Sequence, residues 1–280
     1  MPYYRNSNGL KLYYEFFNGH MDGIPIVMIH GFGSSAGFFH EQLKVLKKNK
    51  VLVFDAEGHG SSEKNPNENL DAHLVTDTAN ELPKLLDVLN IEGQVGIIGH
   101  SLVGGGIGQK FALLHPEKIK FLILLNSGTM YIDNPIRNTF WNLLPQMVRM
   151  NFNEIIIDNL EILLDKTIPF IRKAIIDEFP KNSSQNGFFL DKLDGKIETE
   201  IFDMIQHPLD PSGINCASLI ISAELDNYAP LWMSKNLARD IEDSRLEIIP
   251  MAGHFGPSHR AVAYNEHILK FLRDLNVLSS

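Results

Sequence analysis

The sequence predicts an α/β protein with a mostly parallel sheet of about eight strands and helices on both faces. Two observations predict this fold. Short apolar runs alternate with amphipathic stretches over residues 1–128, and the alternation resumes over residues 208–280. Residues 129–207 between them show helical patterns and no buried strand. We therefore expect one α/β domain, residues 1–128 and 208–280, with residues 129–207 inserted as a helical cap.

The first elements are a hairpin and a series of buried strands. The runs 3–4 and 10–16 flank Ser7-Asn8-Gly9, and Asn-Gly is a strong hairpin turn signal. Short apolar runs then indicate buried strands, while apolar residues at helical spacing indicate the helices that join them. The strands are expected at 24–30, 51–55, 95–99 and 119–125, and the helices at 36–47, 71–89 and 101–114.

The second part of the chain repeats this alternation after the cap. Strands are expected at 217–222 and 246–250, and helices at 231–240 and 261–275. Because consecutive parallel strands need a crossover connection, these helices are expected to cover the sheet.

Composition and charge bound the function. The chain has 280 residues, 44% of them hydrophobic, and a formal net charge of −9. This charge argues against nucleic acid or an anionic membrane as a partner. The one cysteine, Cys216, excludes an internal disulfide. The chain start lacks signal-peptide features, and no apolar run approaches ~18 residues. We expect a cytoplasmic globular protein without a membrane span. Composition says nothing about its chemistry, and a homodimer stays open.

A serine lies where a predicted buried strand meets a predicted helix, in Gly99-His100-Ser101-Leu102. A sharp turn at this junction would lift the hydroxyl of Ser101 above the edge of the sheet. The next backbone N–H, from Leu102, would lie near the helix N-terminus, where developing negative charge is stabilised. Serine alone is a poor nucleophile, so this arrangement needs a base and a group that orients the base.

Two residues elsewhere in the chain could fill those roles. Asp226 follows the predicted strand 217–222, and His254 follows the strand 246–250. Catalytic groups of parallel sheets gather at the carboxyl ends of the strands, so both are expected near Ser101. Glu224 is the nearest rival to Asp226 as the acid.

Five short segments, spread along the chain from His30 to Phe255, together resemble the α/β-hydrolase superfamily. Within it, they resemble the capped branch of serine esterases, lactonases and C–C hydrolases. The resemblance implies that Ser101 is the nucleophile, His254 the general base and acid, and Asp226 the orienting acid. It also implies an oxyanion hole formed by the backbone N–H groups of Phe32 and Leu102, with no metal and no cofactor. The matching segments are His30-Gly31-Phe32-Gly33, 55–62, Gly99-His100-Ser101, Asp226 with Pro230, and Gly253-His254-Phe255.

The expected reaction is hydrolysis of a small, largely apolar carboxylic ester through an acyl-enzyme. We expect the substrate pocket to involve His30, His100, Phe255 and the cap residues Trp141 and Met147. A lactone, or a C–C bond next to a carbonyl, would use much the same residues, so both alternatives stay open.

The sequence departs from the family pattern at one position. The family usually reads Gly-x-Ser-x-Gly, but here residue 103 is valine and the glycine comes at 104. A β-branched side chain at Val103 is expected to crowd the turn. Val103 is also the only feature of the sequence that supports another interpretation, a hydrolase-like protein that binds a small molecule without turnover.

A rival from another class is an NAD-dependent oxidoreductase. The segment 31–36 matches the dinucleotide fingerprint G-x-G-x-x-G/A, and Asp55 follows at about the expected distance. This interpretation gives no role to Ser101, Asp226 or His254, and the hairpin puts extra strands before the motif. The hydrolase interpretation is therefore preferred.

Overall fold

The computed structural model describes residues 2–63, 74–129 and 209–278. Almost all of the expected cap, residues 129–207, lies outside the described residues, and so do Trp141 and Met147.

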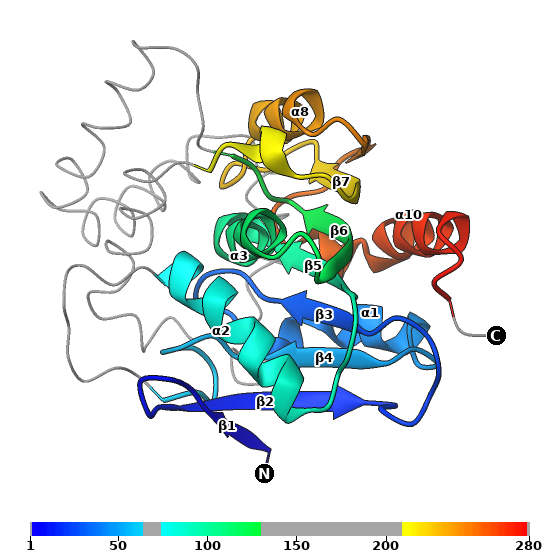
Figure 1. Cartoon of the computed structure of the whole chain (residues 1–280). Helices are drawn as coiled ribbons and strands as arrows, with labels where there is room; N and C mark the ends of the chain where they lie inside the picture. Colours follow the sequence, from blue (N-terminus) through cyan, green and yellow to red (C-terminus); the bar gives the residue numbers. More distant parts are fainter. Residues whose placement is uncertain (1, 64–73, 130–208, 279–280) are drawn as a thin grey trace, which may run out of the picture.

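The described residues form one eight-stranded sheet, as the sequence predicts (Figure 1). Its strand order is β1-β2-β4-β3-β5-β6-β7-β8. β1 pairs with β2, and β2 with β4, in antiparallel fashion, while all other neighbours are parallel. The bounds are β1 (Tyr3–Arg5), β2 (Lys11–Phe17), β3 (Ile26–Ile29), β4 (Val51–Phe54), β5 (Val95–His100), β6 (Ile119–Leu125), β7 (Ala217–Ala223) and β8 (Ser244–Ile249).

Helices cover both faces of the sheet (Figure 1). One face packs against α2 (Leu74–Val88), α3 (Ser101–Leu114) and α8 (Leu231–Asp240). The other packs against α1 (His40–Val45) and α10 (Ala261–Asp274). Three short turns complete the described elements: η1 (Ala36–Phe39), η3 (Pro211–Gly213) and α9 (Gly256–His259).

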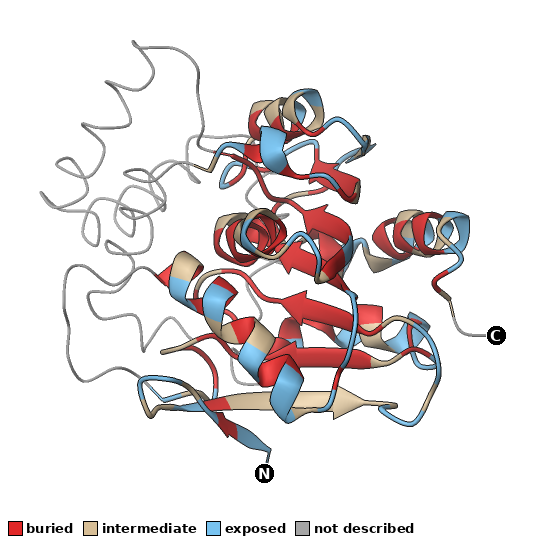
Figure 2. Cartoon of the chain, in the orientation of Figure 1, coloured by how far each residue is buried: buried red, intermediate tan, exposed pale blue. Residues whose placement is uncertain are grey.

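The central strands are buried on both sides, which explains why their sequences are continuously apolar (Figure 2). In β3, Val27 and Ile29 belong to the core beneath α2 and α3. Ile26 and Met28 belong to the core beneath α1 and α10. The period-2 alternation of a strand thus divides one apolar run between two cores.

The structure differs from the sequence expectations mainly at the ends of elements. The single helix expected at 36–47 divides into the 3₁₀ turn η1 and the α-helix α1, because 3₁₀ geometry often opens a helix. The last strand begins at Ser244, two residues before the expected start. Within the described ranges no helix is long and apolar enough to cross a membrane.

Cys216 lies just before β7 and carries a free, buried thiol. Burial raises the pKa of this thiol to about 11, because the thiolate would lose its hydration. The thiol therefore stays protonated at neutral pH.

Candidate active site

Ser101 lies on a strained turn between β5 and α3. β5 ends at His100, α3 begins at Ser101, and the φ angle of Ser101 is 63°. A non-glycine residue in this left-handed region costs roughly 1–2 kcal/mol. Such strain persists only where the surrounding structure imposes it, and it is often found at active sites. The turn therefore has the backbone geometry that exposes a nucleophilic hydroxyl above a sheet.

Val103 does not prevent this turn. Its side chain is buried in the core that packs beneath α2 and α3. The close contact between helix and sheet falls one residue later, at Gly104. A Cβ on Gly104 would lie 2.3 Å from the carbonyl oxygen of Ile29 and 2.5 Å from that of His30. Only glycine allows this approach, so the glycine that the helix needs beside the sheet is Gly104, one residue later than in the family pattern.

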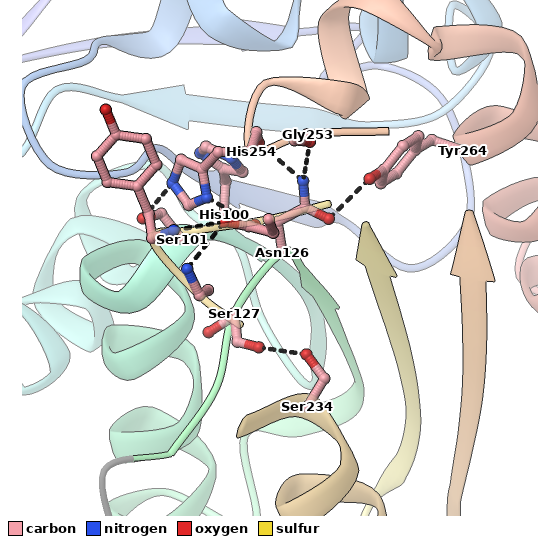
Figure 3. Close-up of polar contacts among 11 residues, drawn as sticks. His100, Ser101, Asn126, Ser127, Ser234, Gly253, His254 and Tyr264 are labelled. Carbon is pink, nitrogen blue, oxygen red and sulfur yellow. Dashed lines mark hydrogen bonds and ion pairs between the residues drawn. The ribbon is translucent and has the colours of Figure 1, made fainter. Parts of the chain in front are cut away.

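His254 lies within hydrogen-bond reach of Ser101 (Figure 3). It is also within reach of Asp226. Its Nε2 is 2.9 Å from Ser101 Oγ, and its Nδ1 is 2.8 Å from Asp226 Oδ2. A carboxylate accepts hydrogen bonds, so Nδ1 carries the proton and Nε2 is left to accept from the serine hydroxyl. This is the tautomer that a general base for serine requires.

Asp226 is fixed by its own loop. Its Oδ1 accepts the backbone N–H groups of Tyr228 and Ala229, both at 2.8 Å, which leaves Oδ2 to face His254. Glu224, the rival from the sequence, instead accepts the backbone N–H of Met251 through Oε2. The structure thus brings Asp226, and not Glu224, to the histidine.

The loop after β3 approaches the serine closely. A Cβ on Gly31 would lie 2.7 Å from Ser101 Cβ, so the peptide that joins Gly31 to Phe32 runs beside the serine. Leu102 is the second residue of α3, and the first N–H groups of a helix lack an intrahelical partner. Both N–H groups expected to form the oxyanion hole therefore lie on segments that flank Ser101.

His30 is fully buried and braces the loop after β3 through backbone hydrogen bonds. Its Nε2 accepts the backbone N–H of Ala56 at 3.0 Å, and its Nδ1 donates to the carbonyl of Gly31 at 2.7 Å. Complete burial lowers the pKa of its imidazole to about 4. A neutral ring is required here, since Nε2 must keep its lone pair.

His100 also supports the site, because it packs beside the turn that carries Ser101. Its ring stacks on Phe38, with centroids 4.1 Å apart, and its Nε2 donates to the carbonyl of His254 at 3.1 Å. Burial lowers the pKa of this imidazole well below its usual value, so the ring is neutral.

Aromatic and apolar side chains surround the histidine. The rings of Phe255 and Tyr228 lie 5.5 and 5.0 Å from the His254 ring, and Phe32 and Leu102 are half-buried beside the serine. Phe255 was expected here. Tyr228 was missed, although its place two residues after Asp226 was a signal that could have found it.

Asp55 binds backbone N–H groups of two loops, whereas the oxidoreductase interpretation would have it bind the ribose of a dinucleotide. Its two carboxylate oxygens accept the backbone N–H groups of Ala36 and Ser61, at 2.6 and 2.7 Å. Asp55 therefore joins the loops after β3 and β4, which disfavours a contact with the ribose of a dinucleotide. The described residues hold no group of three His, Cys, Asp or Glu side chains that could bind a metal ion.

Comparison with known proteins now identifies the family. A family model described as the alpha/beta hydrolase fold matches residues 24–258. The chain belongs to the α/β-hydrolase family. By family, it is a hydrolase. Its sequence is 25% identical over 279 residues to a putative carbamate hydrolase RutD of Azorhizobium caulinodans, covering 99% of this chain and 100% of the relative.

Two solved α/β-hydrolase structures share the fold. A thermophilic esterase from Thermogutta terrifontis has a TM-score of 0.74 and 21% identity, with 99% of each chain covered. The enol-lactonase from Burkholderia xenovorans LB400 has a TM-score of 0.71 and 23% identity, covering 97% of this chain and 100% of that structure. At these identities the likeness concerns the fold.

Proposed function

We propose that the chain is a serine hydrolase that uses Ser101, His254 and Asp226 as its catalytic triad. One observation carries the proposal: a continuous chain of hydrogen bonds leads from the Asp226 carboxylate through His254 to the Ser101 hydroxyl. A purely structural role for a buried histidine would not explain why a serine hydroxyl, held in a strained turn, lies at its second ring nitrogen. A hydrolase needs that serine in that place.

The geometry supports a two-step acyl transfer to water. Ser101 Oγ attacks the substrate carbonyl carbon while His254 Nε2 takes the hydroxyl proton. The same proton then passes to the leaving group, and an acyl-enzyme remains. Water then gives a proton to His254 and attacks the acyl carbon. The bond from that carbon to Ser101 Oγ breaks, His254 returns the proton to Oγ, and the acid is released. The N–H groups of Phe32 and Leu102 would bind the oxyanion of each intermediate, and one such donor is worth about 3–4 kcal/mol.

A small, largely apolar carboxylic ester is the substrate class that we favour. Four described residues on the segments that flank Ser101 and His254 are apolar or aromatic: Phe32, Leu102, Tyr228 and Phe255. A lactone or a C–C bond next to a carbonyl would be attacked by the same serine. Trp141 and Met147 stay predicted pocket residues of the cap.

Labelling with a fluorophosphonate probe tests the triad, because the probe reacts only with an activated serine. Wild type is expected to form one adduct, at Ser101, and Ser101→Ala none. Turnover of p-nitrophenyl butyrate is expected to fall by about 10⁶-fold in Ser101→Ala, with an unchanged circular dichroism spectrum. Equal turnover by the two proteins, or an adduct on another residue, would show that the triad assignment is wrong.

A substrate panel separates the ester from its alternatives. It compares p-nitrophenyl esters, γ-lactones, aryl carbamates and 1,3-diketones by kcat/KM, with Ser101→Ala as the blank for each. We expect the short-chain esters to be preferred. A higher value for the lactones, carbamates or diketones would replace the ester by that class and leave the triad in place.

A further proposal concerns the cellular location of the protein. We propose that the protein acts in the cytoplasm, where the unpaired thiol of Cys216 stays reduced. Its partner is a small-molecule substrate. Whether it forms a homodimer stays a prediction for size-exclusion chromatography with light scattering.

A further inference from the structure

His254 lies on an irregular loop between β8 and α9, and this loop needs support from elsewhere. Strands and helices hold their backbone through their own hydrogen bonds, but an irregular loop has fewer of them. The position of the imidazole over Ser101 therefore depends on what fixes the backbone of residues 253–254.

A side chain from another strand supplies this support. Asn126 follows the last residue of β6, and its Nδ2 donates to the carbonyls of Gly253 and His254, at 3.1 and 2.7 Å (Figure 3). The amide thus spans two successive carbonyls of the histidine loop. Its own backbone N–H donates to Ile221 in β7, which ties Asn126 to the sheet.

The amide is itself held in one orientation. The Tyr264 hydroxyl, from α10, donates to Asn126 Oδ1 at 2.7 Å, which leaves Nδ2 to face the histidine loop. Both side chains belong to residues that are fully buried, at 0% exposure. A buried amide with its wrong end toward two carbonyls would be costly, so Tyr264 selects the orientation in which Asn126 donates.

The backbone of Asn126 explains why asparagine suits this position. Its φ angle is 46°, in the left-handed region that asparagine and aspartate adopt more readily than most side chains. Asparagine thus meets two demands at once, a left-handed bend at the end of β6 and two amide protons for the loop.

The backbone carbonyl of His254 links the histidine loop to the strand end that precedes Ser101. His254 O accepts from Asn126 Nδ2 and also from His100 Nε2, and His100 directly precedes Ser101. The backbone of His254 is therefore tied to the carboxyl ends of both β5 and β6, next to the nucleophile.

We propose that Asn126, oriented by Tyr264, is a positioning residue that holds the His254 backbone so that the imidazole reaches Ser101. The inference rests on the proposed function, because it takes Ser101 and His254 as the reacting pair. A purely structural role predicts lower stability only. A positioning role also predicts slower activation of Ser101 in protein that is fully folded.

Two variants remove the contacts from opposite ends. Asn126→Asp keeps the shape and tolerates the left-handed backbone, but its carboxyl group cannot donate to both carbonyls of the loop. We expect the second-order rate of fluorophosphonate labelling at Ser101 to fall about 10- to 100-fold. Tyr264→Phe introduces no charge and frees the amide to rotate, with an expected fall of about 3- to 10-fold. It keeps the test decisive if Asn126→Asp does not fold.

The controls repeat each substitution at a remote buried site. Asn49→Asp alters another buried amide, whose Nδ2 donates to the carbonyl of Val277. Tyr4→Phe removes another tyrosine hydroxyl, which donates to Glu81 in α2. Both controls are expected to label within about twofold of wild type, because distant sites act independently.

Two further readouts separate positioning from stability. Turnover of p-nitrophenyl butyrate is expected to show a lower kcat with KM unchanged, because the substrate contacts remain. The far-downfield proton signal of the His254 Nδ1–H bond to Asp226 should shift or broaden in both variants and persist in both controls.

The outcomes are distinguishable. A wild type that takes up no probe overturns the proposed function, and this inference with it. Labelling of both variants within about twofold of wild type, or an equal fall in the controls, overturns the inference alone.

Discussion

The two residues of the proposed catalytic pair, Ser101 and His254, are held in different ways. Ser101 is positioned by its backbone, through a left-handed turn between β5 and α3 and the close packing of Gly104 on the carbonyls of β3 and the residue after it. His254 is positioned by side chains from other elements, Asn126 at its backbone and Asp226 at its ring.

This difference separates two sources of precision. Where backbone packing fixes a residue, as at Ser101, its position does not depend on the rotamer of a supporting side chain. Here it depends on the absence of a side chain at Gly104. Side-chain support depends on buried hydrogen bonds, whose donors and acceptors must all be paired. Substitutions in the backbone packing that supports Ser101 should therefore act mainly on folding, and substitutions in the side chains that support His254 mainly on rate.

Among the residues that support the serine and the histidine, the largest effect is expected from Asp226→Asn. Oδ1 of residue 226 already accepts two backbone N–H groups, so the new amide would turn its NH₂ toward His254. His254 Nδ1 must then accept, and the proton moves to Nε2, where it blocks general-base action. We expect kcat to fall about 10⁴-fold with little loss of stability.

The matched control for that variant is Glu224→Gln. Its amide oxygen can still accept the N–H of Met251, so turnover should stay close to that of wild type. If Glu224→Gln lost as much activity as Asp226→Asn, the acid would be misassigned.

Gly104→Ala addresses the serine side. Its Cβ would lie 2.3 Å from a backbone oxygen that cannot move without disturbing β3. We expect a loss of about 3 kcal/mol in the free energy of unfolding, measured by urea denaturation.

Gly108→Ala in the same helix is the control for this loss. Its Cβ would meet only side-chain ends, Leu122 Cδ1 at 3.0 Å and Ile97 Cγ2 at 3.1 Å. These ends can shift, and alanine favours the helix by about 1 kcal/mol, so the net change should be small. Equal stability of Gly104→Ala and wild type would contradict backbone positioning of the serine.

A smaller effect concerns His30, which braces the loop beside Ser101 and makes the free energy of unfolding depend on pH. His30 has a pKa of about 4 in the folded protein against 6.5 unfolded, so the unfolded chain binds the extra proton. The stability that this group contributes is fully present above about pH 6.5 and is lost as the pH falls toward 4. Between pH 8 and pH 5 the loss from His30 is about 2 kcal/mol.

His30→Gln isolates this contribution, because glutamine can bond to the loop without titrating. The variant is expected to start less stable than wild type but to lose about 2 kcal/mol less between the two pH values in urea denaturation. An identical loss in both proteins would show that His30 is not the group that titrates.

The serine turn and the acid at the histidine ring were predicted from the sequence, whereas the support of the histidine backbone by Asn126 was not. A glycine–serine motif at the junction of an apolar strand and a helix is local, so one short window predicts the elbow. Asn126 donates to backbone carbonyls that lie more than one hundred residues away, and backbone carbonyls leave no mark in a sequence. An asparagine after a strand is more simply explained as a turn residue.

The same reasoning covers His30 and His100. Both stand in motifs that resemble the family, which suggested a pocket, but only the folded structure shows that His30 bonds to Ala56 and His100 to His254. Local patterns predict which elements form, while contacts between distant loops decide what each polar residue does.

The solitary thiol of Cys216 gives this protein a built-in reporter. A thiol that is buried and protonated is silent toward disulfide reagents until the start of β7 opens to solvent. The rate at which such a reagent modifies the native protein therefore measures how often that part of the sheet opens, with no engineered label and no second cysteine to confuse the signal.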